Sequence, residues 1–317
     1  MKISRNIRGI IFALLSGISW GFSGACAQYL FGAYGLDPLW ISSVRMLFAG
    51  LMLAVVALIG FRGAFMALWK SPQYLVRLII FSIFGLAFCQ ITYLLTIQYS
   101  NAGTATIIQY IGPVLTVFYL CFLARRFPTK RENLALVCVI IGVFLLATHG
   151  NPAVMVLSPE ALFWGLVSAF AYMLYSLLPR KLMFRFGSVP VVAAALLIDG
   201  IAFTLALQSW TKIPTMDASG YVVLFVGLVF FGTVVGFSLF FQAVKDIGAA
   251  KSGLMASIET VSATAFAVLW LGTSFAWIDI VGFVFIMATV FILAKHPGDP
   301  DMKSDDTNTE TNADSAT

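Results

Sequence analysis

The chain has 317 residues, of which 60% are hydrophobic and only 10% are charged, and its mean hydropathy is +0.95. Soluble domains carry roughly 25% charged residues, so this composition excludes an ordinary water-soluble fold. The net charge of +5 does not indicate nucleic-acid binding, because the basic residues lie between long apolar segments.

Ten apolar segments follow one another, each close to the roughly 20 residues that a helix needs to cross a bilayer. The first segment begins like a signal peptide, after Lys2, Arg5 and Arg8, but its apolar run continues to Phe31, which favours a retained helix. We predict an all-α membrane protein with ten transmembrane helices, over residues 9–31, 38–60, 75–98, 102–123, 133–149, 160–179, 189–209, 219–243, 249–271 and 276–294.

The first five segments are repeated weakly by the last five. A shift of 152 residues places Ser16 on Ser168 and Trp20 on Tyr172, and a shift of 147 residues places Gly85 on Gly232 and Tyr93 on Phe240. The change of shift falls in one polar connection, 61–73. Because each copy has an odd number of spans, the second copy enters the membrane upside down. The predicted architecture is two inverted five-helix repeats around a central cavity, which is typical of carriers with alternating access.

The basic residues predict the orientation. Alternate loops, together with both ends of the chain, hold 16 of the 19 Lys and Arg residues, whereas the other set of loops holds Lys212 alone. Since positive loops stay in the cytoplasm, both termini are predicted to be cytoplasmic. The predicted divisions are a first repeat at 1–150, a second repeat at 151–296 and a disordered acidic tail at 297–317.

Three charged residues lie deep inside predicted spans, where a charge is expensive unless it faces a partner or water. Glu259 lies about 15 Å into the ninth span, Asp199 lies at a similar depth in the seventh, and Arg45 lies about 10 Å into the second. Each of them either locks helices together as part of an internal ion pair or belongs to a substrate or proton site. Burial disfavours the charged form of a carboxylate, so Glu259 and Asp199 are candidate proton-coupling residues.

Polar and aromatic residues gather in the first, third, fourth and sixth spans, whereas the fifth and tenth are almost wholly aliphatic. This contrast predicts wet inner helices and dry outer ones, the latter facing lipid or a second copy of the chain. Pro113 interrupts the fourth span opposite Thr260 in the repeat alignment, either as a site-forming break or as a structural kink. The predicted substrate-binding residues are Trp20, Arg45, Tyr93, Gln109, Tyr110, Tyr172 and Glu259.

Several short motifs resemble the drug/metabolite transporter superfamily, specifically the ten-helix EamA-type carriers and a bacterial inner-membrane subgroup of them. The resemblance covers residues about 9–294. The family often carries an acid shortly before the last helix of each repeat and a proline after the buried acid, and this chain has neither. The motifs are Trp20-Gly21, Arg45 with Ala49, Ser100-Asn101-Ala102, Pro113, Gly142, Thr148-His149-Gly150 and Trp164-Gly165.

The resemblance implies secondary transport of small metabolites, often export of amino acids or related compounds, through a cavity between the halves. Arg45 would pair with a substrate carboxylate, and Glu259 would meet an amine or a proton. A passive channel or sensor remains an alternative. An intramembrane enzyme is a distant third. The chain has only two histidines, His149 and His296, and no two acids within a helix have the spacing of metal ligands. The chain has no phosphate-binding loop for ATP, and no cofactor or metal is expected.

Overall fold

The computed structural model of the chain describes residues 4–294, without the side chains of residues 249, 250 and 294. Every regular element in this range is a helix. Among the described residues, nine helical segments are long and apolar enough to cross a membrane, and the tenth, Trp277–Leu293, is a shorter apolar helix. The predicted ten-helix membrane fold is therefore confirmed. The predicted acidic tail at 297–317 lies outside the described residues.

The helices follow the predicted spans, and two short helices, Arg62–Lys70 and Arg180–Phe186, lie between spans. The first half contains α1 (Arg5–Tyr34), α2 (Pro38–Gly60), α3 (Arg62–Lys70), α4 (Pro72–Ile80), η1 (Phe81–Ala87), α5 (Phe88–Tyr99), α6 (Ala102–Gln109), α7 (Gly112–Leu123) and α8 (Lys130–Thr148). The second half contains α9 (Pro159–Leu177), α10 (Arg180–Phe186), α11 (Ser188–Leu207), η2 (Ser209–Thr211), α12 (Ala218–Val222), η3 (Val223–Val235), α13 (Gly236–Ile247), α14 (Ala249–Ala256), α15 (Ile258–Leu269) and α16 (Trp277–Ala294).

One connection differs from the sequence prediction. The segment between Phe61 and Gln73 was expected to be a polar linker, but most of it forms the short helix α3. Its Phe65 and Leu68 are buried in the same apolar cluster as α2 and α11. Burial of these two side chains on one face stabilises a helix that is too short to be stable by its backbone alone.

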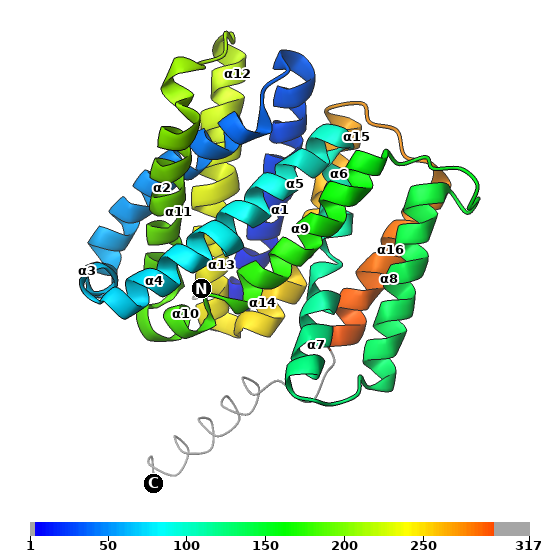
Figure 1. Ribbon diagram of the computed structural model, residues 1–317, viewed down its shortest axis with the longest axis horizontal. Helices are drawn as coiled ribbons and strands as arrows, with labels where there is room; N and C mark the ends of the chain where they lie inside the picture. The colour runs from blue at the N-terminus through cyan, green and yellow to red at the C-terminus, as the bar shows by residue number, and fades with distance from the viewer. Residues whose placement is uncertain (1–3, 295–317) are drawn as a thin grey trace.

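The two halves pack as related copies. Helix α2 packs against α11, and α8 packs against α16, so equivalent spans of the two repeats meet directly. Helix α1 packs against α13 and α15, while its counterpart α9 packs against α5, α6 and α7. In Figure 1 the α8–α16 pair stands at one side of the molecule, and α2 and α11 lie together at the other. The contacts stay the same when the repeats are exchanged, as a two-fold relation between the halves requires.

Glycines set both contacts between equivalent spans. A Cβ atom added at Gly50 would lie 2.8 Å from the backbone of α11, and one at Gly200 would lie 2.4 Å from the backbone of Leu47 on α2. In the other pair, a Cβ at Gly142 would lie 2.9 Å from the carbonyl oxygen of Gly282. Small residues at these points let the helix backbones touch, which is how membrane helices gain packing energy.

We expect Gly200→Ala to destabilise the protein by about 1–3 kcal/mol, the usual cost of overpacking, because its methyl group would overlap the α2 backbone. The matched control is Gly32→Ala, which changes a helical glycine with no atom within 4 Å of the added Cβ. Thermal unfolding of the detergent-solubilised protein measures both. Equal stability of Gly200→Ala and the wild type would contradict the close crossing of α2 and α11.

Candidate functional site

The fourth and ninth spans are both broken, and at equivalent positions. The fourth span stops at Gln109 and resumes at Gly112, and the ninth stops at Ala256 and resumes at Ile258. The shift of 147 residues places Tyr110 on Ser257, so the two breaks coincide in the repeat alignment. Discontinuous helices of this kind surround the substrate sites of inverted-repeat carriers.

The two breaks arise from different residues. In the fourth span, Pro113 follows the break and has no N–H to continue the hydrogen-bond ladder. In the ninth span the equivalent position is Thr260, and hydroxyl groups bond backbone carbonyls instead. Ser257 Oγ donates to Leu254 O over 2.6 Å, and Thr260 Oγ1 donates to Ser257 O over 2.6 Å. The sequence predicted the first break but not the second.

Glu259 lies in the first turn of α15, immediately after this break. The positive end of the helix dipole stabilises a carboxylate at this position. Helix α1 comes unusually close here, because a Cβ atom on Gly21 would lie 2.8 Å from the carbonyl oxygen of Glu259 and 2.6 Å from Ala263 N. Gly21 of the Trp20-Gly21 motif therefore allows α1 to pack directly on the segment that carries the acid.

Side chains from four other spans interact electrostatically with Glu259. Its carboxylate interacts with Arg45 of α2 and with the phenol of Tyr110 at the end of α6. Further groups within electrostatic range are Cys89 and Tyr93 of α5 and Tyr172 and Tyr175 of α9. We call these seven residues, together with Gln109 described below, the central cluster: Arg45, Cys89, Tyr93, Gln109, Tyr110, Tyr172, Tyr175 and Glu259. Five of the predicted site residues thus meet through their charges and dipoles.

The central cluster is polar and is not fully closed to solvent. Glu259, Tyr93, Tyr110 and Tyr172 come from different helices, and each keeps partial solvent accessibility. Phenols, a carboxylate and a guanidinium gathered in this way are suited to a small polar ligand.

Arg45 is directed inward and held by the second repeat. Its side chain is 8% exposed, and its Nε donates a hydrogen bond of 2.9 Å to Thr233 Oγ1 in η3. Thr233 in turn donates to Leu228 O, five residues earlier, across the π-helical geometry of that segment. The corresponding part of the third span, η1, is also π-helical. Such segments are frequent at functional sites, and no sequence pattern predicted either of them.

The remaining predicted residues border the central cluster or lie apart from it. Gln109 Nε2 donates to Ser168 Oγ over 2.8 Å and approaches Cys89 Sγ at 3.6 Å, which joins it to the cluster. Trp20 packs against Phe237 and Phe240 of α13, with ring centroids 5.5 and 5.2 Å away. Asp199 is fully buried beside Ser82 of η1, so the structure does not bring it into the cluster.

In the described part of the chain, three polar side chains outside the predicted site have buried atoms without a hydrogen-bond partner, and two of them, Gln90 and Ser23, lie on the helices next to the central cluster, whereas Thr204 is on α11. Both amide atoms of Gln90, the neighbour of Cys89 in α5, are buried without a hydrogen-bond partner, as is Ser23 Oγ on α1. A Cβ atom at Gly232, the residue before Thr233, would lie 2.2 Å from Ser23 Oγ. Unpaired buried polar atoms are costly, so both residues are candidates for contact with a bound ligand. Their polarity was visible in the sequence, but their missing partners were not.

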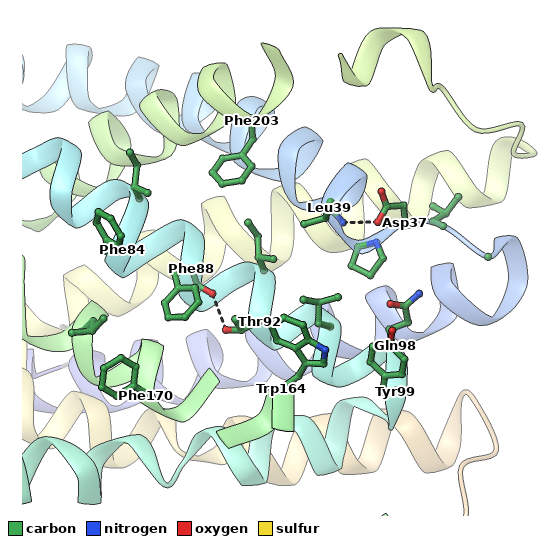
Figure 2. Close-up of a pocket in the computed structure, with 17 residues that line it drawn as sticks. Asp37, Leu39, Phe84, Phe88, Thr92, Gln98, Tyr99, Trp164, Phe170 and Phe203 are labelled. Carbon is green, nitrogen blue, oxygen red and sulfur yellow. Dashed lines mark hydrogen bonds between the residues drawn. The ribbon is translucent and has the colours of Figure 1, made fainter. Parts of the chain in front are cut away.

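A mainly apolar cavity lies beside α5. It has a volume of about 970 Å³ and lies between α2, η1, α5, α9 and α11. Figure 2 shows its aromatic lining, with Phe84, Phe88, Phe170, Phe203 and Trp164 around the space and Asp37, Gln98 and Tyr99 near one end. Thr92 faces this cavity, whereas Cys89 and Tyr93 on the same helix belong to the central cluster. Helix α5 therefore separates an apolar cavity from the polar cluster.

Comparison with known proteins identifies the class. The model of the EamA-like transporter family matches residues 7–148 and 160–295, which are the two halves of this bundle. The chain belongs to the EamA-like transporter family, whose members are multi-pass membrane transporters. The predicted resemblance is confirmed.

Individual relatives agree with this assignment. The chain is 35% identical over 289 residues to the "Uncharacterized inner membrane transporter YicL" of Salmonella typhimurium, covering 90% of this chain and 95% of that protein. It is 24% identical to the "Uncharacterized transporter YetK" of Bacillus subtilis, with coverage of 83% and 81%. A protein of known crystal structure shares the fold with a TM-score of 0.61 and 17% identity, covering 92% of this chain and 98% of that one.

We expect Thr233→Val to destabilise the protein by about 1.5–3 kcal/mol, because it removes a hydrogen-bond acceptor from the buried, charged Arg45. Thr116→Val is the matched control, since Thr116 Oγ1 bonds only the carbonyl oxygen of Gly112 in its own helix. Thermal unfolding in detergent measures both. A Thr233→Val protein as stable as Thr116→Val would show that the second repeat does not hold Arg45.

Proposed function

We propose that this protein is a secondary active transporter that moves a small zwitterionic metabolite, an amino acid or a related compound, across the bacterial cytoplasmic membrane. Transport would be export by alternating access, with both termini in the cytoplasm. The predicted divisions at 1–150 and 151–296 would be the two moving halves. The family assignment supports transport, and the central cluster supports the class of substrate.

One observation carries this choice of substrate. Arg45 and Glu259 interact electrostatically inside the bundle, yet no direct ion pair joins them among the ion pairs of the described residues. Two opposite charges that interact without a direct ion pair match the carboxylate and the amine of an amino acid. Guanidinium groups bind carboxylates well because they offer several donors in a plane. The tyrosines around Glu259 would enclose the substrate backbone.

The ends of the bundle support alternating access. At the end where α1 begins, Arg8 makes two hydrogen bonds of 2.8 Å to Asp246 of α13, tying the two repeats together. At the opposite end a cavity of about 470 Å³ lies beside Gln28, Gln98 and Ser100. Tyr34 donates to Asp217 at that end and lowers the pKa of this carboxyl to about 2. We infer a conformation closed toward the predicted cytoplasmic side, so Arg8 and Asp246 must separate during transport.

Reconstituted vesicles offered a panel of radiolabelled amino acids should show saturable counterflow of at least one of them. Arg45→Gln and Glu259→Gln should each lower its rate by tenfold or more, because each removes one charge from the substrate site. Arg77→Gln is the control, since Arg77 is an exposed cation near a helix end. Flux that is linear in concentration and shows no counterflow would indicate a channel instead.

A second prediction concerns protons. If Glu259 exchanges a proton during the cycle, Glu259→Gln should flatten the dependence of the remaining counterflow on pH, because glutamine cannot ionise. The control is Glu160→Gln, which removes an exposed acid from the first turn of α9. The measurement is counterflow in vesicles with equal pH on both sides. An unchanged pH profile in Glu259→Gln would restrict this residue to substrate binding.

A further inference from the structure

Asp199 occupies an unusual place for a carboxyl group. It lies in the middle of α11 and is 0% exposed. One of its oxygens, Oδ1, is hydrogen-bonded with Ser82 Oγ of η1, whereas Oδ2 has no hydrogen-bond partner. An ionised carboxylate with a single hydrogen bond in such a site would be very costly, because a buried charge needs a counter-charge or several donors.

No cation compensates this carboxyl group within the described residues. Ser82 is the one side chain that interacts with Asp199 strongly enough to influence its ionisation. On α2, Arg45 interacts with Glu259, Tyr93, Cys26 and Cys89. The charged residues of the other helices packed against α11 are Arg62, Lys70, Arg77, Arg180, Lys181, Arg185, Lys245 and Asp246, which lie near the ends of their helices, away from the middle of α11.

The hydrogen bonds around Ser82 indicate where a proton would be. Ser82 Oγ lies 2.9 Å from the carbonyl oxygen of Ala195 and also contacts Asp199 Oδ1. A hydroxyl has one hydrogen to donate, and a carbonyl can only accept. If Ser82 donates to Ala195, the second contact needs a hydrogen from Asp199. The arrangement is fully satisfied when Asp199 is protonated and donates to Ser82, which donates to Ala195.

We propose that Asp199 and Ser82 form a proton-binding site in which Asp199 is protonated in this conformation. The proposal rests on the proposed carrier function for its role, namely that this site takes up and releases the coupling proton. Loss of the proton breaks the Asp199 O–H bond and transfers the proton to water. A buried carboxylate with no counter-charge remains, and it favours an arrangement in which η1 moves away from α11 and water reaches the acid.

The position of the site explains how it would act on substrate binding. Segment η1 continues directly into α5, which carries Cys89 and Tyr93 of the central cluster. The Asp199–Ser82 pair is arranged like the Arg45–Thr233 pair, since each joins a charged residue of α2 or α11 to a hydroxyl on a π-helical segment of the other repeat. Arg45 belongs to the central cluster, whereas Asp199 is fully enclosed.

Infrared spectroscopy of the protein in lipid vesicles tests the site without a substrate. The wild type should show the carbonyl band of a protonated carboxylic acid at neutral pH, and Asp199→Asn should lack that component, whereas the Glu160→Gln control should retain it. Asn resembles the neutral acid in size and shape, so the variant is expected to fold. Ser82→Ala should shift the band, because it removes the hydrogen-bond partner. Identical spectra for the wild type and both site variants would overturn the proposal.

Transport then separates this proposal from the proposed function. Asp199→Asn should retain counterflow at equal pH but lose accumulation driven by a pH gradient at least tenfold, because it cannot release a proton. Absence of counterflow in the wild type would refute the carrier function while leaving the infrared assignment intact. Gradient-driven accumulation at the wild-type level in Asp199→Asn would refute the coupling role of this site.

Discussion

The contacts between equivalent spans constrain the rest of the structure. Within a bilayer, apolar side chains gain little by leaving lipid for protein, so helices associate mainly by close packing. Gly50 with Gly200, and Gly142 with Gly282, allow this at both sides of the molecule. Since each contact joins a span to its own repeat copy, the two lie along the axis that relates the halves. The cross-packing of α1 on α13 and α15, and of α9 on α5, α6 and α7, follows from that axis.

Irregular helices concentrate where the two halves meet. A continuous helix satisfies its own backbone in hydrocarbon, so each break or π-helical turn needs other partners. Hydroxyl groups provide them: Ser257 and Thr260 bond carbonyls at the break before Glu259, and Thr233 bonds a carbonyl within η3 while accepting from Arg45. These same places carry the charges of the interior. The departures from regular structure therefore position the groups on which the proposed substrate and proton sites depend.

Most of the fold was predictable, because it follows from local composition. Apolar length and loop charge specify the spans, and the weak repeat specifies the two halves. Helix α3 was missed because two buried apolar side chains, Phe65 and Leu68, stabilise it from outside the segment. The break in the ninth span was not predicted, because the position equivalent to Pro113 is Thr260, and a threonine does not by itself indicate an interrupted helix. Of the predicted site residues, Arg45, Tyr93, Gln109, Tyr110, Tyr172 and Glu259 meet in the central cluster, while Trp20 packs on α13 and Asp199 lies with Ser82.

The amino-acid sequence by itself determined that this chain is a ten-span membrane protein built from two repeats, and it identified the charged residues that lie within the spans. Those properties depend on residues close together along the chain. Only the tertiary structure decided that Arg45 and Glu259 lie within electrostatic range of each other, and that Asp199 pairs with a serine 117 residues before it. Which side chains meet depends on how each helix is rotated about its axis and where it crosses its neighbours, and close packing between distant segments fixes both.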